Sequence, residues 1–406
     1  MRILLVNKFH YFRGGSEKYY FELANLLKKH GHTVAFFSMN NEKNISTGDT
    51  EYFVDEIDMN TGSKLEAFNV IYSKKNKELM EKALEEFKPD IVHINNFQRQ
   101  LSASIIEAVK EKNIPIVMTA HDLNPICPAS IMLYDGKICE DCITKGYTQC
   151  IKKKCIKGST LKSLLGCIEK KYYDYHKVFC DIDCIISPSE FNKNELLKGQ
   201  LKCNDIKVLH NFVNETQHSQ YKLGDYAFYC GRLSKEKGIF NLVKAIKELP
   251  QGKLLIAGDG PEKDKIEACI KEYNLQDRVF MLGYLNQDQV REYIDNARFI
   301  VVPSICIENC PYSILETMEA GKPIIGSRIG GIPELVKDDE NGYTFDSDNI
   351  IELRDKMKLL FDNDEKAELF SKNSRRMFEQ SYSSESYYNN LIEIYKKYIK
   401  SKNETN

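Results

Sequence analysis

The 406-residue sequence has no apolar run of about 18 residues or more, the length that a membrane-spanning helix needs. Its amino terminus carries only a short apolar run, Ile3 to Val6, which is too short for the core of a secretory signal peptide. It also lacks a large excess of charge, because 57 Lys and Arg residues face 59 Asp and Glu residues. A chain balanced in this way is not a general nucleic-acid binder. We therefore expect a cytoplasmic protein without a nucleic-acid partner.

Tryptophan is absent, from which nothing about function follows. The 42% of hydrophobic and 29% of charged residues are typical of a folded globular protein. At roughly 100–200 residues per domain, the length predicts two or three domains. Without an export signal, we expect the 13 cysteines to be thiols or metal ligands rather than disulfides.

The first forty residues predict a βαβ unit. Arg2–Asn7 is typical of a buried strand, and a loop containing Gly14 and Gly15 follows it. Ser16 is expected to cap the next helix, and Thr33–Ser38 predicts the second strand. The same alternation predicts three further strands in the first half of the chain: Asp90–Ile94, Ile114–Thr119 and Asp183–Ser187.

A second series of buried runs predicts another parallel sheet with helices on both faces. Its expected strands are Tyr226–Cys230, Lys253–Ala257, Arg278–Leu282, Phe299–Pro303, Pro323–Gly326 and Tyr343–Phe345. Residues 211–224 are polar and form the candidate linker. We expect domains at 1–215, with a cysteine-rich insert near 125–170, and at 216–382. The remaining residues, 383–406, predict a helix that closes the second domain or crosses back to the first.

Two cations, Arg232 and Lys237, follow the first strand of the second series within the motif GRLSKEKG. Open α/β sheets bind ligands at the carboxyl ends of strands, so this pair could hold a diphosphate. The alternative is a pair of solvated surface cations. Gly14 and Gly15 lie at a helix start, where free N–H groups favour an anion, although a plain turn fits them equally well.

Two carboxylates, Glu308 and Glu316, lie eight residues apart on an expected loop and an expected helix. This placement suits contacts to sugar hydroxyls and to a ribose better than a hydrolytic acid–base pair, and a solvated helix face is the alternative for Glu316. His121 ends a first-domain strand, where it could position a reacting centre or serve a structural role. His93 also ends a strand and is expected to be structural or to line a cleft.

The ordered set of motifs resembles the retaining nucleotide-sugar glycosyltransferases of the GT-B fold, family 4 (group 1). The matching pieces are Gly14-Gly15, PDIVH at 89–93, Thr119–Asp122, GRLSKEKG at 231–238, AGDGPE at 257–262, Glu308-x7-Glu316 and GGIPE at 330–334. The match extends over essentially the whole chain in order. The resemblance implies an α/β fold of two Rossmann-like doubly wound domains that face a central cleft.

The resemblance also implies roles for individual residues. His121, Glu308, Arg232 and Lys237 would be catalytic, with the two cations neutralising the leaving diphosphate in place of a metal ion. Nucleotide-sugar contacts would come from Gly14, Gly15, Arg232, Lys237, Glu308, Cys310, Pro311, Tyr312, Ser313 and Glu316. No cofactor is expected for catalysis beyond a UDP- or GDP-sugar donor.

The family commonly has Glu-Gly-Phe-Gly-Leu where this chain has Glu308-Asn309-Cys310-Pro311-Tyr312. Pro311 has no N–H group to donate, so the amides of Tyr312 and Ser313 would hold the donor or its pose would shift. The variant leaves the donor sugar open.

The insert carries two features of its own. Cys139-x2-Cys142 and Cys150-x4-Cys155 have spacing suited to a structural zinc ion, with Cys127 as an alternate ligand and ordinary thiols as the alternative. Nine lysines between residues 145 and 177 face only two carboxylates, and apolar residues are interleaved at helical spacing: Leu161, Leu164, Leu165 and Ile168. This stretch could rest on an anionic membrane, or it could be a solvated helix that packs by its apolar side.

The sequence therefore predicts a retaining, metal-independent glycosyltransferase that moves a sugar from a nucleotide donor to a polysaccharide or lipid-linked acceptor in cell-surface glycan biosynthesis. It would work in the cytoplasm or at the inner face of the cell membrane. A nucleotide-sugar epimerase of similar fold and a non-catalytic nucleotide-sugar-binding scaffold are the alternatives. The donor, the acceptor, the linkage and the oligomeric state stay open.

Overall fold

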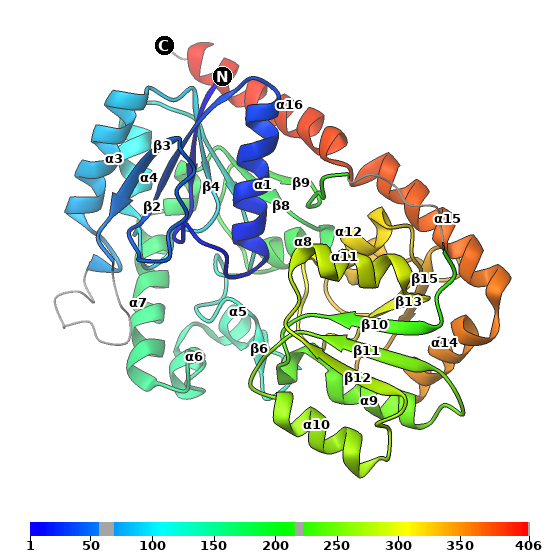
Figure 1. Cartoon of the computed structure of the whole chain (residues 1–406). Coiled ribbons are helices and arrows are strands. Elements are labelled where there is room, and N and C mark those ends of the chain that lie inside the picture. The colour runs from blue at the N-terminus through cyan, green and yellow to red at the C-terminus, as the bar shows by residue number, and fades with distance from the viewer. Residues whose placement is uncertain (57–68, 216–221, 405–406) are drawn as a thin grey trace. The chain divides into compact units, whose positions relative to one another are not determined.

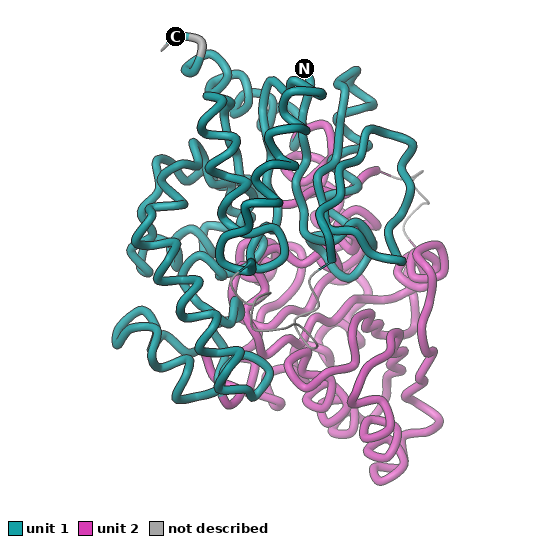
Figure 2. The backbone as a smooth tube through the Cα atoms, turned by 90° about the vertical axis from the view of Figure 1, so that its left-hand side faces the viewer, with its two compact units in different colours: residues 1–134, 139–210, 387–406 teal, residues 135–138, 211–386 magenta. Residues whose placement is uncertain are grey.

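The computed structural model describes residues 1–56, 69–215 and 222–404 (Figure 1). The chain forms two compact units, shown in two colours in Figure 2. Unit 1 comprises Met1–Tyr134, Cys139–His210 and Tyr387–Asn406, and unit 2 comprises Asp135–Ile138 and Asn211–Ser386. Part of the candidate linker, residues 216–221, lies outside the described residues.

Unit 1 contains a seven-stranded parallel sheet with the strand order β3-β2-β1-β4-β5-β8-β9. Its strands are β1 (Arg2–Val6), β2 (Thr33–Met39), β3 (Thr50–Val54), β4 (Ile91–Ile94), β5 (Ile116–Thr119), β8 (Cys184–Ser187) and β9 (Ile206–Val208). The five strands predicted in this half are confirmed. The edge strands β3 and β9 escaped prediction. Strand β3 begins with two polar residues and is only partly buried, and β9 has only three residues.

Helices cover the unit 1 sheet, and a cluster of short elements follows β5 (Figure 1). The helices are α1 (Gly15–Lys29), α3 (Lys74–Phe87), α4 (Ser104–Glu111), α5 (Asp141–Lys145), α6 (Thr148–Lys152), α7 (Thr160–Tyr175), η1 (Val178–Asp181) and α8 (Glu190–Lys198). Two short strands, β6 (Leu133–Tyr134) and β7 (Lys137–Ile138), precede α5.

The prediction that Ser16 caps the first helix is wrong. Helix α1 begins at Gly15, and Gly14 is its N-cap residue with no side-chain cap. Ser16 lies inside the first turn, where its hydroxyl donates to Glu17 Oε1 at 3.0 Å. The hydroxyl of a residue already inside the helix is too far along to accept from the first free amides.

Unit 2 contains a six-stranded parallel sheet with the order β12-β11-β10-β13-β14-β15. The six predicted strands are confirmed with ends within a residue or two: β10 (Tyr226–Cys230), β11 (Lys253–Ala257), β12 (Val279–Gly283), β13 (Phe299–Val302), β14 (Ile324–Ser327) and β15 (Gly342–Phe345). After β10, the chain adds β11 and β12 on one side of the sheet and then β13, β14 and β15 on the other. The strand order therefore reverses between β10 and β13, which is where open α/β sheets form ligand sites.

The helices of unit 2 pack on both faces of its sheet (Figure 1). They are η2 (Lys235–Lys237), α9 (Ile239–Lys247), α10 (Lys263–Glu272), α11 (Gln287–Asn296), α12 (Tyr312–Glu319), α13 (Ile332–Leu335), α14 (Ile350–Asp362) and α15 (Asp364–Ser381). A buried apolar core, which includes Phe299, Leu242 and Ile256, lies between the sheet and its helices.

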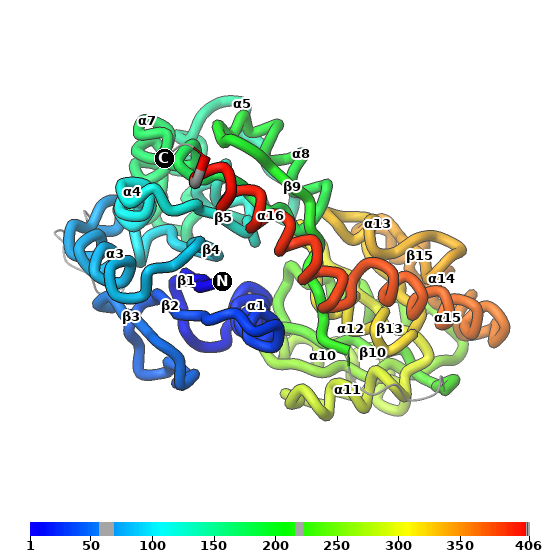
Figure 3. Tube along the Cα trace, turned by 90° about the horizontal axis from the view of Figure 1, so that it is seen from above, coloured from blue at the N-terminus to red at the C-terminus, as the bar shows by residue number. Residues whose placement is uncertain are grey.

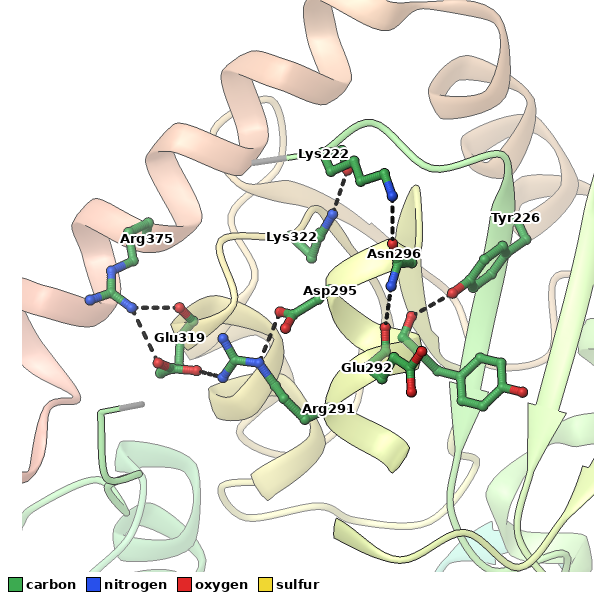
Figure 4. A network of polar contacts seen from close by, with 10 residues as sticks. Lys222, Tyr226, Arg291, Glu292, Asp295, Asn296, Glu319, Lys322 and Arg375 are labelled. Atoms are coloured by element: carbon green, nitrogen blue, oxygen red, sulfur yellow. Dashed lines mark hydrogen bonds and ion pairs between the residues drawn. The ribbon is translucent and has the colours of Figure 1, made fainter. Parts of the chain in front are cut away.

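A polar network anchors α12 to the neighbouring helices (Figure 4). Glu319, at the end of α12, is fully buried between Arg291 of α11 and Arg375 of α15. Arg375 also donates to the Glu319 carbonyl oxygen at 2.6 Å. Next to it, Lys322 Nζ donates to the Lys222 carbonyl oxygen at 2.7 Å, and burial lowers the pKa of Lys322 to about 8. Because a buried carboxylate is stable only when it is paired, this network fixes the position of α12.

The last helix, α16 (Ser384–Glu404), joins unit 1 through its tyrosines. Tyr387 contacts Tyr19 of α1, and Tyr395 hydrogen-bonds with His93 of β4. Figure 3 shows this helix beside the unit 1 strands. In the described residues, no helix combines the length and the apolar character needed to cross a membrane.

Candidate active site

In unit 2, the loops that follow β10, β11, β13 and β14 meet at one edge of the sheet. The backbone N–H of Gly231, after β10, donates to the carbonyl oxygen of Ala257 at the end of β11, at 3.1 Å. Across the reversal point, the N–H of Ile305 donates to the carbonyl oxygen of Glu236 at 2.9 Å. The loops that carry Arg232, Lys237 and Glu308 are therefore joined by direct backbone hydrogen bonds.

Glycines allow these loops to approach so closely. A Cβ added to Gly258 would lie 1.9 Å from the carbonyl oxygen of Gly231, and one added to Gly238 would lie 1.8 Å from that of Pro303. Gly258 and Gly238 also have positive φ angles of +135° and +70°, a backbone region that side chains disfavour. Gly238 of the GRLSKEKG motif and Gly258 of the AGDGPE motif are thus required by close packing against neighbouring loops.

The loop that carries Glu308 rests on the turn after β14. A Cβ on Gly330 would lie 2.2 Å from the Glu308 carbonyl oxygen, and the N–H of Gly331 donates to the same oxygen at 2.7 Å. The Gly330-Gly331 motif therefore fixes the backbone of Glu308 and, with it, the direction of its carboxylate.

Lys237 and Glu308 form the central ion pair of this edge. Lys237 Nζ donates to Glu308 Oε1 at 2.6 Å, and the hydroxyl of Ser304 donates to the same oxygen at 2.8 Å. The side chains are 30% and 17% exposed, so the pair is partly accessible to solvent. Burial opposes the charge of Lys237, but the Glu308 carboxylate outweighs it and raises the pKa of Lys237. Lys237 is therefore a permanent cation at neutral pH.

Arg232 adds a second cation to the same loop and is exposed. Burial by itself would raise the pKa of Glu236. The Ser234 hydroxyl, which donates to Glu236 Oε1 at 2.6 Å, and the charges of Lys237 and Arg232 outweigh burial and lower this pKa. Arg232 and Lys237 thus lie together at the start of the segment that leads into α9. This arrangement can hold an anion such as a diphosphate.

Glu316 lies in the second turn of α12 and is half-buried. Burial, together with the Glu316 carboxylate, raises the pKa of Cys230 to about 12, which places Glu316 beside the end of β10. The predicted site residues of unit 2 therefore come from both sides of the reversal point of the sheet.

In the Cys310–Ser313 segment, Cys310 packs in the apolar core, whereas Pro311, Tyr312 and Ser313 form the start of α12. The Cys310 thiol is buried in an apolar cluster with Ile314, and burial raises its pKa to about 12. The Cys310 carbonyl accepts from Asn211 Nδ2 at 3.0 Å, so neither group is directed at a ligand. Pro311 is the N-cap of α12, and the helix begins at Tyr312. The amides of Tyr312 and Ser313 lie in the first turn of α12, the end of a helix that favours an anion.

In unit 1, Gly14 and Gly15 are exposed at the start of α1, and His121 follows β5. His121 Nε2 donates to Asn95 Oδ1 at 2.8 Å, and its ring packs edge-on against Tyr19 with centroids 4.8 Å apart. Burial and the Lys8 charge lower the pKa of His121 to about 3. The imidazole is therefore neutral at physiological pH and can hydrogen-bond a substrate, but it cannot act as a charged acid.

His93 is fully buried and has a structural role. Its ring hydrogen-bonds with Tyr395 of α16 and with Thr119 Oγ1, the latter at 2.8 Å. Burial lowers the pKa of His93 to about 3. The strand-end position of this residue was visible in the sequence, but its partner on α16 lies 302 residues further along the chain.

Sequence reasoning missed a charged group near His121. Lys8 lies just after β1 and is half-buried. The loss of solvation lowers its pKa, while the nearby Asp122 carboxylate acts in the opposite direction. Nearby, the half-buried Arg99 pairs with the buried Glu169, and the backbone N–H of Arg99 donates to Glu169 Oε1 at 2.9 Å. In the sequence, only the position of Lys8 directly after the first predicted strand could have indicated that this charge lies near His121.

The four cysteines of the predicted zinc site are not arranged as a metal site. Cys150 lies close to Cys155 and Cys167, and Cys142 lies near Cys150, whereas the Cys139 sulfur accepts from Lys153 Nζ at 3.2 Å. Within residues 1–56, 69–215 and 222–404, no group of three or more His, Cys, Asp or Glu side chains could hold a metal ion. The thiol of Cys167, which the prediction left out, is part of this cluster.

Comparisons with known proteins identify the family and the fold of the chain. A model described as glycosyltransferase family 4 matches residues 13–217, and one described as glycosyl transferases group 1 matches residues 214–377. The two α/β units and these matches define the GT-B class of fold. The chain belongs to glycosyltransferase family 4, group 1.

An uncharacterized glycosyltransferase of Methanocaldococcus jannaschii is 32% identical over 230 residues, which cover 56% of this chain and 63% of that protein. The chain thus aligns with less than two thirds of this relative. An uncharacterized 42.6 kDa protein in the cps region of Klebsiella pneumoniae is 26% identical over 92% of this chain and 99% of its own length. The Anabaena protein HepE in complex with UDP has the same fold, with a TM-score of 0.69 and 16% identity over 97% of this chain and 99% of that chain.

Proposed function

We propose that the protein is a retaining glycosyltransferase that transfers a sugar from a UDP- or GDP-sugar to a polysaccharide or lipid-linked acceptor in cell-surface glycan biosynthesis. The observation that carries the proposal is the Lys237–Glu308 pair at the strand-order reversal of unit 2, with Arg232 on the same loop. The UDP complex of a protein of the same fold supports a nucleotide donor. We place the protein in the cytoplasm or at the inner face of the cell membrane.

The proposed reaction needs positive charge where the donor breaks. The bond between the anomeric carbon and the diphosphate breaks, and the acceptor oxygen bonds to the same face of that carbon. The acceptor proton passes to a phosphate oxygen of the leaving group. Lys237 and Arg232 would neutralise the charge that develops on the diphosphate, so they would act mainly in the transition state and no metal ion would be required.

The two carboxylates would orient the donor. Glu308 is fixed by Lys237, Ser304 and the Gly330-Gly331 turn, so it would accept hydrogen bonds from the donor sugar in a constant position. Glu316 would bind the ribose, and the amides of Tyr312 and Ser313 would replace the glycine amides that the family commonly supplies. In unit 1, neutral His121 would hydrogen-bond the transferred sugar, and Gly14 and Gly15 would allow close approach of donor or acceptor.

The test is a thermal-shift panel of UDP, GDP and ADP with their sugars. A ligand that binds only the folded state raises the melting temperature by mass action. We expect one nucleotide series to stabilise the protein, Arg232→Ala to lose the effect, and Arg376→Ala, an exposed arginine on α15, to keep it. Stabilisation that Arg232→Ala retains would overturn the site assignment.

Turnover then separates the alternatives. A transferase consumes donor productively only with an acceptor, whereas an epimerase converts the nucleotide sugar alone and a scaffold binds it without conversion. Acceptor-independent formation of a second nucleotide sugar would overturn the proposal in favour of the epimerase.

A further inference from the structure

A continuous chain of hydrogen bonds runs through the interior of unit 1 and ends on helix α16. His93 Nε2 lies 2.8 Å from the Thr119 hydroxyl, and the Tyr19 hydroxyl lies 3.1 Å from the same Thr119 oxygen. The chain continues from His93 to the hydroxyl of Tyr395 and from Tyr19 to the hydroxyl of Tyr387. All five side chains are buried. Because a buried polar group is costly without its partner, each member of the chain holds the next one in place.

Tyr19 is the member of this chain that contacts the candidate active site. Its ring packs edge-on against His121, with the centroids 4.8 Å apart and the ring planes at 68°. Edge-to-face packing of this kind is a favoured arrangement of aromatic rings. The hydroxyl at the far end of the Tyr19 ring is held by Thr119 and Tyr387. The ring of Tyr19 therefore presents a fixed surface to the imidazole of His121.

Asn95 sets which nitrogen of His121 carries the proton. Asn95 is buried, and its Nδ2 is directed at the carbonyl oxygen of Val6, 3.4 Å away. Its Oδ1 therefore faces His121 Nε2, at 2.8 Å. An amide oxygen can only accept a hydrogen bond, so Nε2 must be the donor. Because burial keeps the ring of His121 neutral, the acceptor nitrogen is then Nδ1.

The hydroxyl groups of the chain are not needed to fill space. Phenylalanine in place of Tyr19 and valine in place of Thr119 would occupy nearly the same volume, and burying them would require no hydrogen-bond partner. What the hydroxyl groups add is direction, since a hydrogen bond restricts both the distance and the angle between two side chains. Direction matters most at a side chain that must meet a substrate in one orientation.

We propose that Asn95 and Tyr19 are positioning residues for His121: Asn95 makes Nδ1 the acceptor nitrogen, and Tyr19, held by the buried chain, fixes the plane of the ring. The proposal rests on the proposed function, in which His121 hydrogen-bonds the transferred sugar. With the proton on Nε2, the ring can accept at Nδ1 from a hydroxyl group but cannot donate from that atom to an oxygen of the substrate.

The first measurement needs neither a donor nor turnover. In protein that contains isotope-labelled histidine, NMR distinguishes a protonated ring nitrogen from a bare one, and the His121 signals are those lost in His121→Gln. We expect a protonated Nε2 and a bare Nδ1 in the unaltered protein at neutral pH. Asn95→Leu removes the acceptor and should populate the other tautomer, whereas Tyr19→Phe should leave the tautomer unchanged.

Asn95→Asp is a second variant that keeps an acceptor at the same place. Its carboxylate should keep the proton on Nε2 and raise the pKa of His121, because a nearby negative charge stabilises the imidazolium. Asn389→Asp, at an exposed position of α16, is the matched control and should leave the His121 signals unchanged. An unchanged pH titration of His121 in Asn95→Asp would overturn the role of Asn95.

Turnover tests the role of Tyr19. Tyr19→Phe and Tyr387→Phe should each lower kcat by about tenfold and change KM for the donor little, because each loses a hydrogen bond that orients His121. Tyr175→Phe, an exposed tyrosine of α7, is the control. In the His121→Gln background, Tyr19→Phe should have no further effect, since it acts through the ring that has been removed. Thermal melts check that every variant is folded.

Three outcomes would overturn the proposal. A proton on Nδ1 of His121 in the unaltered protein, or a tautomer unaffected by Asn95→Leu, would contradict the role of Asn95. A loss of turnover in Tyr19→Phe that persists in full in the His121→Gln background would show that Tyr19 serves packing alone. The NMR measurement is independent of any nucleotide sugar, so a failure of the proposed function in the donor-binding test is separate from a failure of this proposal.

Discussion

The Lys237–Glu308 pair offers the sharpest test of the site, because stability and catalysis should respond to it by very different amounts. Lys237→Ala removes the cation and leaves a carboxylate whose side chain is only 17% exposed. The pair is partly screened by water, so its loss should cost about 1–2 kcal/mol of unfolding free energy, between the values for exposed and buried pairs.

The effect on catalysis should be larger. If Lys237 neutralises the leaving diphosphate, its loss should lower turnover by about 100-fold to 1,000-fold, the usual cost of removing one group that stabilises transition-state charge. Glu308→Gln keeps the shape of the side chain and an oxygen that can accept from Ser304, so it tests the charge alone. Lys244→Ala, an exposed lysine on α9, is the control and should change neither quantity.

The assay combines urea unfolding with steady-state turnover for the single variants and the double variant. Coupling between the two positions should be about 1 kcal/mol in stability, whereas turnover of the double variant should be no lower than that of the worse single variant. Turnover of Lys237→Ala within about tenfold of the unaltered protein, measured on folded material, would refute the reasoning and leave the pair a structural role.

Three further predictions concern the fold around the site. The pKa of buried His93 is lowered to about 3 in the folded state, whereas the unfolded state binds its proton near pH 6.5. His93 should therefore contribute a loss of stability of about 1.4 kcal/mol per pH unit as the pH drops from 6.5 toward 3, and His93→Gln should remove this contribution and leave that of His121 in a pH series of thermal melts. Gly258→Ala should cost about 2 kcal/mol or more because its Cβ would meet a carbonyl oxygen at 1.9 Å, whereas Gly283→Ala, with φ +72° and open space around it, should cost about 1 kcal/mol; equal losses in urea unfolding would contradict the packing argument. Glu319→Gln should cost about 3 kcal/mol, because Arg291 and Arg375 would lose their buried partner, and a thermal melt close to that of the unaltered protein would show that the network is dispensable.

The change from glycine to Pro311 has a simple structural consequence. Pro311 precedes the first residue of α12, where its fixed φ is compatible with a helix start and its missing N–H removes one donor. The next amides, of Tyr312 and Ser313, become the first that can face a ligand. This segment is the place where the donor specificity of the chain would differ from that of other family members.

The insert shows where reasoning from spacing was insufficient. Cysteine spacing predicted a zinc site at Cys139, Cys142, Cys150 and Cys155, but the structure turns the Cys139 sulfur toward Lys153 and brings Cys167 of α7 near Cys150. Spacing along the chain does not specify which direction each side chain takes in a region of short helices. The apolar positions of α7 were found correctly, but whether they are covered depends on neighbours that the sequence does not identify.

Local sequence patterns predicted the two sheets, the order of the motifs and every strand of the two sheets except β3 and β9. Buried parallel strands form continuous apolar runs, and glycines and charged residues mark the loops at their carboxyl ends, so these signals are local. Three contacts could not be predicted and appear only in the folded chain: Lys237 with Glu308, His93 with Tyr395 of the last helix, and Lys157 and Lys162 of the insert with Lys8 around one cavity. These contacts join residues tens to hundreds of positions apart, and their partners are chosen by the packing of whole elements, which no local pattern encodes.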